Sequence, residues 1–121
     1  MGKEGIAREI ESYQHIIGEI WRRIAPVLGP LSLRAIAERA VALTSAEFKF
    51  IGMIRVTDEG LSLEKLWEEL DTSGDPRAIR NGFRKLVVNL MDILTGLTGG
   101  ILVNRLLREV EGLRELTEEE V

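Results

Sequence analysis

A heptad-spaced apolar seam near the start of the chain constrains the fold more than any other feature. Apolar residues recur alternately four and three positions apart, at Ile6, Ile10, Tyr13, Ile17, Ile20, Ile24 and Val27. This spacing places their side chains on one face of an α-helix. Ile16, Trp21 and Leu28 widen that face, which is typical of a bundle helix that contacts two neighbours.

Proline and glycine mark the boundaries of the first two helices. Pro26 lacks a backbone N–H, so we expect the first helix to kink or end near residue 25. Gly29 and Pro30 then stop it. A second helix is predicted over residues 33–43, with Ser32 as its N-cap.

For residues 44–62 the sequence does not decide between helix, strand and loop. Residues 44–47 form a capping-box pattern. Either one helix ends and another begins at this pattern, or a single helix continues through it. Alternating apolar residues over 48–56 are typical of a strand. We favour a helix to about Gly52, followed by an extended or hairpin element near residues 53–62.

A turn and two further helices are predicted next. The polar residues 57–60 indicate a turn, and Ser62 is a suitable cap for a short helix over residues 63–70. Asp75 and Pro76 form a strong start signal, because a carboxylate N-cap is followed by proline at the first helical position.

A second apolar seam follows this start signal. It comprises Ile79, Phe83, Leu86, Leu90, Ile93 and Leu97. The phase changes at residues 98–100, so we interpret residues 76–115 as two helices joined by a tight turn, with one kinked helix as the alternative. We expect the last helix to end between residues 112 and 116, and residues 117–121 to form a frayed acidic tail.

These elements predict an all-α, single-domain, antiparallel bundle of four to five helices over residues 1–116. The length of 121 residues, 45% of them hydrophobic, is enough for one core. The apolar segment 86–103 raises the alternative of a membrane span, since Gly96 and Gly100 have GxxxG spacing. Its polar residues fall on one side of the helix, however, as in a bundle helix, and we expect no span.

Composition excludes several kinds of site. The chain has no Cys and one His, which excludes disulfides, thiolate metal sites and multi-histidine metal sites. A formal net charge of −4 has the wrong sign for a domain held to nucleic acid mainly by charge. We expect no metal and no cofactor.

Composition also suggests a source and a location. Charged residues make up 30% of the chain, a pattern that suits ion-pair networks in a thermophilic protein. Residues 1–25 contain several glutamates and no continuous apolar run, so no secretory signal is predicted and a cytoplasmic location is expected.

A basic cluster follows Pro76 in the first turns of the predicted long helix. Its members are Arg77, Arg80, Arg84 and Lys85. Positive charge at a helix N-terminus opposes the helix dipole, so a compensating negative group is expected. In one interpretation that group is a bound anion or partner. In the interpretation that we favour, it consists of acidic residues nearby or on a neighbouring helix.

Two weaker patterns have ordinary explanations. Residues 33–51 resemble a helix-turn-helix, but Val41 stands where the turn favours glycine and the segment lacks a basic recognition face. Nucleic-acid binding is therefore not favoured. His15 lies one turn from both Glu11 and Glu19, which fits a surface ion pair better than a metal site.

No catalytic constellation, phosphate loop or family signature is identified in the chain. The sequence therefore favours a non-enzymatic regulatory or scaffold module that acts through protein–protein contacts. One alternative is a small-ligand sensor with an apolar pocket near Trp21 or Trp67. The other is nucleic-acid binding through the basic cluster. A homodimer is expected, with its interface on the first helix at Ile6, Ile10, Tyr13, Ile17, Ile20, Trp21 and Ile24.

Overall fold

The computed structural model describes residues 2–69 and 76–118, with side chains from residue 5 onward. The elements are α1 (Gly2–Leu28), α2 (Pro30–Ser45), the 3₁₀ helix η1 (Lys49–Met53), β1 (Arg55–Thr57), β2 (Gly60–Ser62), α3 (Glu64–Glu69), α4 (Pro76–Thr98), α5 (Gly100–Glu109) and α6 (Leu113–Glu118). The all-α prediction with a minor hairpin is confirmed.

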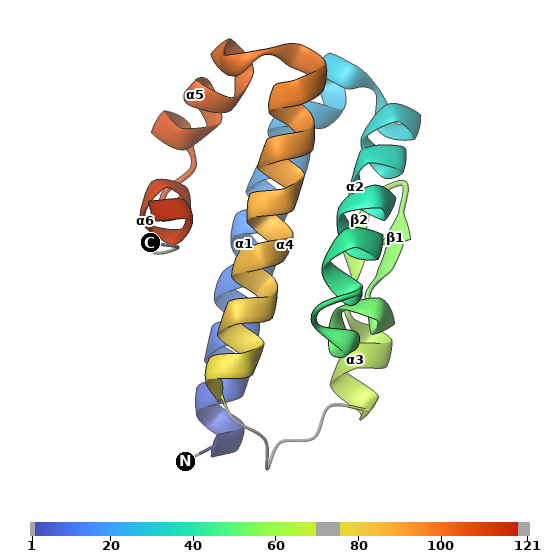
Figure 1. The fold of residues 1–121 in the computed structure, drawn as a ribbon, viewed down its shortest axis with the longest axis vertical. Helices are drawn as coiled ribbons and strands as arrows, with labels where there is room; N and C mark the ends of the chain where they lie inside the picture. Colours follow the sequence, from blue (N-terminus) through green and yellow to red (C-terminus); the bar gives the residue numbers. More distant parts are fainter. Residues whose placement is uncertain (1, 70–75, 119–121) are drawn as a thin grey trace.

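Helices α1, α2 and α4 lie side by side and form the body of the bundle (Figure 1). Helix α2 runs opposite to α1 and α4, while α5 and α6 turn back along the other side of α4 (Figure 1). The hairpin lies between α1 and α2, because β2 contacts α1 and β1 contacts α2. The buried apolar side chains of all these elements form one cluster.

The first helix continues past Pro26 to Leu28, so the predicted end near residue 25 was wrong. A proline this close to the end removes one helical hydrogen bond at little further cost. The N–H of Gly29 donates to the Ala25 carbonyl at 2.8 Å and closes the last turn. Gly29 has φ 87° and, with Pro30, separates α1 from α2 as predicted.

Gly29, not Ser32, occupies the N-cap position of α2. Of the two outcomes expected at residues 44–47, the helix breaks there, because α2 ends at Ser45 and the 3₁₀ helix η1 follows from Lys49. The Thr44 hydroxyl donates to the Ala40 carbonyl at 2.7 Å instead of capping a new helix. The α-helix ends at Ser45, and the 3₁₀ helix η1 carries helical structure past Gly52 to Met53 before the hairpin begins.

The hairpin confirms the turn predicted at residues 57–60. Arg55 pairs with Ser62, and Thr57 pairs with Gly60. The Thr57 hydroxyl donates to the Gly60 carbonyl at 2.8 Å, and the Glu59 N–H donates to the Thr57 hydroxyl at 3.2 Å. These local bonds stabilise a tight polar turn.

The long C-terminal segment is divided twice. Helix α4 begins at Pro76 as expected, while its predicted cap Asp75 lies outside the described residues. Gly99, with φ 82°, separates α4 from α5, which confirms two helices in place of one kinked helix. A further break at Gly112, with φ 87°, separates α5 from α6. Residues 117 and 118 of the expected frayed tail belong to α6; residues 119–121 lie outside the described part.

Aromatic stacking and one polar contact hold the three long helices together. The rings of Tyr13 and Phe83 stack with centroids 5.4 Å apart, and the ring of Phe50 lies 5.8 Å from that of Phe83. Asn89 of α4 donates to the hydroxyl of Thr44, a buried residue of α2, at 2.9 Å. Among the described residues, no helix has both the length and the apolar character needed to cross a membrane.

Candidate ligand-binding groove

The residues expected at a dimer interface face the core of their own chain. Each of the seven is at most 7% exposed, and α2, α4 and the hairpin cover α1. The interface was placed on α1 because the seam was expected to remain partly uncovered. Since the chain covers the seam itself, that argument does not hold, and a dimer would have to use another surface.

The basic cluster lies on the first turns of α4, and part of it pairs with α1. Arg80 contacts the Glu9 carboxylate through its Nη2 atom at 2.9 Å and its Nε atom at 3.2 Å. Arg84 donates to the side-chain oxygen of Asn81 at 2.9 Å. The Arg80–Glu9 pair agrees with the interpretation that acidic residues of a neighbouring helix compensate the cluster.

Residues 33–51 do not form the helix-turn-helix that the sequence superficially resembles and that was not favoured. Helix α2 runs unbroken to Ser45, and a short 3₁₀ helix follows it where a recognition helix would have to lie. Val41, which stood against the motif in the sequence, lies within one continuous helix and marks no turn.

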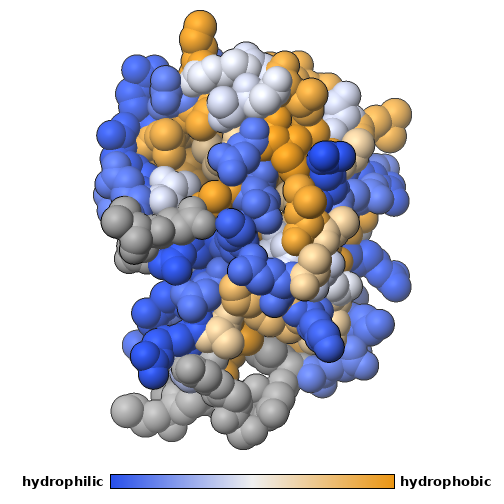
Figure 2. Space-filling model, in the orientation of Figure 1, coloured by the Kyte–Doolittle hydropathy of each residue, from blue (hydrophilic) through white to orange (hydrophobic). Residues whose placement is uncertain are grey.

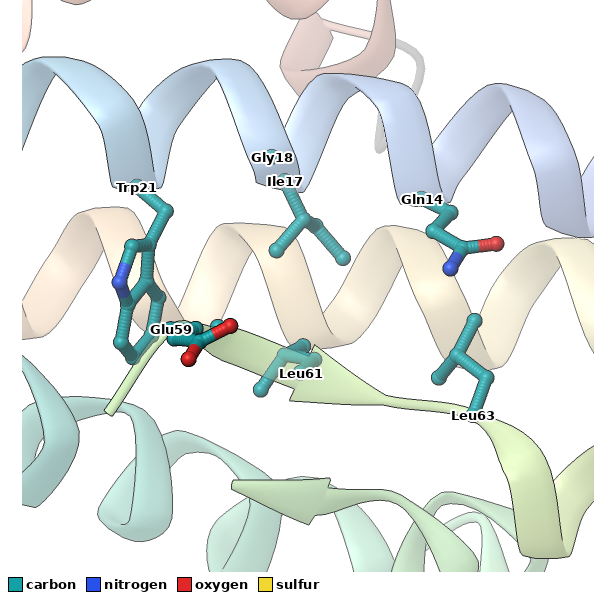
Figure 3. A pocket seen from close by; sticks show the side chains of 8 residues that line it. Gln14, Ile17, Gly18, Trp21, Glu59, Leu61 and Leu63 are labelled. Carbon is teal, nitrogen blue, oxygen red and sulfur yellow. The ribbon is translucent and has the colours of Figure 1, made fainter. Parts of the chain in front are cut away.

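A cavity of about 170 Å³ opens between α1 and the hairpin (Figure 3). Its lining consists of Gln14, Ile17, Gly18, Trp21, Glu59, Gly60, Leu61 and Leu63. A wider, more open cavity of about 450 Å³ shares five of these residues and extends along β2 to Glu64 and Trp67 of α3. We call the two together the hairpin groove.

Trp21 forms one end wall of the inner cavity. Its side chain is 6% exposed, and its ring lies against Gly60, where an added Cβ would be 3.9 Å from Cγ and Cδ2. Gly60 has φ 136°, a conformation that favours glycine. The tryptophan therefore contacts the backbone of the turn directly.

A salt bridge holds the same turn from its other side. Arg34 of α2 contacts the Asp58 carboxylate at 3.1 Å and the Glu38 carboxylate at 3.2 Å. The hydrogen bond that Arg34 donates to Asp58, followed by the one that it donates to Glu38, raises the pKa of Arg34. The hairpin is thus held by α2 on one side and by Trp21 on the other.

Gly18 leaves open space in the wall that α1 contributes. No atom lies within 4 Å of a Cβ built at this position, and the residue lines the inner cavity. Glycine in a helix interior is about 0.5–1 kcal/mol less stable than alanine. No packing contact requires glycine here, and its effect is to keep the groove wide.

The groove has apolar side chains among polar groups in its walls and carboxylates at its rim. Its ionisable lining residues, within the described part of the chain, are Glu59 and Glu64. Figure 3 shows the Glu59 carboxylate beside the indole of Trp21, with Ile17 and Leu61 facing each other across the cavity. Gln14 adds an amide group opposite Leu63 (Figure 3). This arrangement can bind an apolar body and orient one polar or charged group.

The sequence placed Trp21 and Trp67 near a pocket but missed Gln14, Gly18 and Glu59. A mid-helix glycine beside an apolar seam was an available signal for Gly18. Glu59 carried no signal, since it enters the site only through the path of the hairpin. Within residues 2–69 and 76–118, no three His, Asp or Glu side chains gather as a metal site would require.

A second cavity, of about 230 Å³, lies between α1 and α5 and is lined partly by arginines. Its charges are paired within the protein. Arg23 contacts Glu19 at 2.7 Å and Glu109 at 3.6 Å, and Arg105 contacts Glu109 at 3.1 Å. Arg22 also pairs with Glu19. These pairs oppose binding of an added anion.

Large apolar side chains are exposed where the helices turn. Val27 and Leu31 flank Gly29 and are 60% and 76% exposed, while Leu97 and Ile101 flank Gly99 and are 67% and 86% exposed. The α1–α2 and α4–α5 junctions lie at the same end of the bundle (Figure 1). Hydrophobic surface gathers toward that end in Figure 2. We call these four residues the apolar end.

Comparisons of the chain with models of protein families, with curated proteins and with solved structures give no match.

Proposed function

We propose that this chain is a non-enzymatic binding module that takes a small molecule with an apolar body into the hairpin groove. The observation that carries the proposal is the cavity of about 170 Å³ beside Trp21, continuous with the wider one that reaches Trp67. A pocket beside these tryptophans is what separates a ligand sensor from a pure scaffold. We also propose that the protein is cytoplasmic and that it comes from a thermophilic source.

The groove has the features of a built pocket. Trp67 is 41% exposed at its outer edge, which leaves a large aromatic face available to a ligand. The turn opposite α1 packs against Trp21 and carries the exposed Arg34–Asp58 pair, so both walls of the groove are present before a ligand arrives. A preformed site lowers the entropy cost of binding.

The test is titration with a set of small neutral aromatic compounds, followed by NMR of the two indole N–H signals. We expect saturable shifts of the Trp21 and Trp67 signals. Gly18→Leu fills the cavity from α1 and should abolish these shifts. Gly5→Leu is the matched control on the same helix, because its Cβ also meets open space but lies outside the groove.

Two results would contradict the proposal. One is the absence of any saturable shift at millimolar compound. The other is binding that survives in Gly18→Leu as well as in Gly5→Leu. Thermal unfolding of both variants checks that each is folded before its binding is compared.

The apolar end favours a second candidate function, a protein–protein contact. Four large apolar side chains are at least 60% exposed at the two helix junctions, and clustered exposed apolar residues are typical of contact surfaces. A second copy of the chain is the simplest partner, in keeping with the predicted homodimer.

Light scattering of Leu31→Ser with Ile101→Ser tests this second candidate. If the chain is a dimer, the double variant should become a monomer without losing stability. Leu43→Ser is the control, since Leu43 is 49% exposed on α2 but lies outside the apolar end. A wild-type monomer at every concentration, or a dimer unaffected by the double variant, contradicts the contact.

A further inference from the structure

We infer that the hairpin groove selects an organic cation, a small molecule whose ring fills the inner cavity and whose ammonium group lies beside the Glu59 carboxylate. This inference rests on the proposed function, and it adds the chemical class of the ligand.

The size of the inner cavity limits the apolar body of the ligand. An engineered apolar cavity of about 150 Å³ in another protein binds benzene. The inner cavity here, at about 170 Å³, is of similar size and has Ile17, Trp21 and Leu61 in its walls. One six-membered ring therefore fits, while a larger body would have to extend into the outer cavity toward Trp67.

The charge of the rim favours a cation. Glu59 belongs to both cavities and Glu64 to the outer one, and the described lining contains no Lys, Arg or His. Both carboxylates are exposed at the rim, where they attract an ammonium group and repel an anion, an effect that salt weakens. Elsewhere on α1, by contrast, the arginines that line the second cavity are paired with Glu19 and Glu109.

The tryptophans favour the same class of ligand. The face of an indole ring is electron-rich and attracts ammonium groups within about 6 Å of its centre. Glu59 and Trp21 both line the inner cavity, and because Trp21 is 6% exposed, its ring serves there as a wall for the apolar body of the ligand. Glu64 and the 41% exposed Trp67 both line the outer cavity, where an ammonium group can meet an accessible indole ring.

The turn holds Glu59 in place. Its backbone N–H donates to the Thr57 hydroxyl, the preceding Asp58 pairs with Arg34, and the following Gly60 packs on Trp21. The backbone on both sides of Glu59 is therefore fixed by contacts to α2 and α1. A charge held in position needs less reorganisation on binding than a charge on a mobile loop.

The experiment compares three probes that share one ring: benzylamine, which is cationic at pH 7, neutral benzyl alcohol and anionic benzoate. Each is titrated at low salt and followed through the Trp21 and Trp67 indole signals. We expect benzylamine to bind about tenfold more tightly than benzyl alcohol, with benzoate weakest. Added salt should reduce the preference for the cation.

Glu59→Gln removes the charge and keeps the shape of the side chain. It should reduce the affinity for benzylamine to that of benzyl alcohol and leave the alcohol unchanged. Glu47→Gln is the control, because it makes the same charge change at an exposed residue outside the groove. It should preserve the preference.

The outcomes separate the inference from the proposed function. Equal binding of benzylamine and benzyl alcohol, both blocked by Gly18→Leu, overturns the selection of a cation and leaves the binding module intact. Tighter binding of benzoate than of benzylamine also overturns the selection of a cation and leaves the binding module intact. Failure of all three probes to shift either indole signal overturns both.

Discussion

The indole ring of Trp21 lies directly on the backbone of Gly60, with 3.9 Å between its Cγ and Cδ2 atoms and the place where a Cβ would be. This contact joins the middle of α1 to the turn of the hairpin. It forms one end of the hairpin groove, and the φ of 136° at Gly60 favours glycine at this position.

Gly60→Ala should therefore lower the free energy of unfolding by about 1–2 kcal/mol, because an L-residue is strained at this positive φ. Urea denaturation measures the loss. Gly52→Ala is the nearby control, since Gly52 has no positive φ and its Cβ would meet Ser45 at an ordinary 3.5 Å. The control should change stability by less than about 0.5 kcal/mol.

Replacing each of two glycines of α4 by alanine should change the free energy of unfolding in opposite directions. A Cβ at Gly82 would lie 2.4 Å from the ring of Phe50, which packs beside Phe83, so Gly82→Ala forces a core ring to move. We expect a loss of about 1–3 kcal/mol. Gly96→Ala meets no atom within 4 Å and should stabilise the helix by about 0.5–1 kcal/mol. Equal changes in the free energy of unfolding for the two variants, measured by denaturation, would contradict the close packing of Gly82 against Phe50.

The hydrogen bond between Asn89 and Thr44 should couple α4 to α2. Thr44→Val leaves the Asn89 amide without its buried acceptor, and we expect a loss of about 1–3 kcal/mol. Asn89→Leu removes the partner. A double-mutant cycle should show a coupling energy of at least about 0.5 kcal/mol. Additive losses would mean that the bond contributes nothing specific.

Stability should fall in acid partly because of Glu19. The hydrogen bond from Arg23 is the largest influence and lowers the pKa of Glu19 below its ordinary 4.5. A carboxylate with a lowered folded-state pKa stabilises the fold above its unfolded value, and this contribution is lost as pH falls through the folded value. Urea midpoints of the wild type and Glu19→Gln should therefore differ at pH 7 and converge below pH 4.5. High salt should reduce the difference, since the pair is exposed.

The elements with a strong local pattern were predictable. The seams of α1 and α4, the stop at Gly29, the start at Pro76 and the break at Gly99 all follow from periodicity or from one residue's backbone preference. The failures fall where two local signals compete. Thr44 has the features of a cap, yet its hydroxyl bonds to Ala40 within α2 and to Asn89 across the bundle. Tertiary packing gave that hydroxyl better partners than a new helix end.

The sequence by itself determined that this chain is a helical bundle without thiol chemistry, because apolar spacing, helix boundaries and composition are local properties. Tertiary structure alone decided what covers the seams and what lies beside them. It buried the α1 seam under the chain's own helices and left Val27, Leu31, Leu97 and Ile101 exposed at the junctions. It also brought Glu59 to Trp21, a pairing that depends on the path of the hairpin across α1 and that no local spacing encodes.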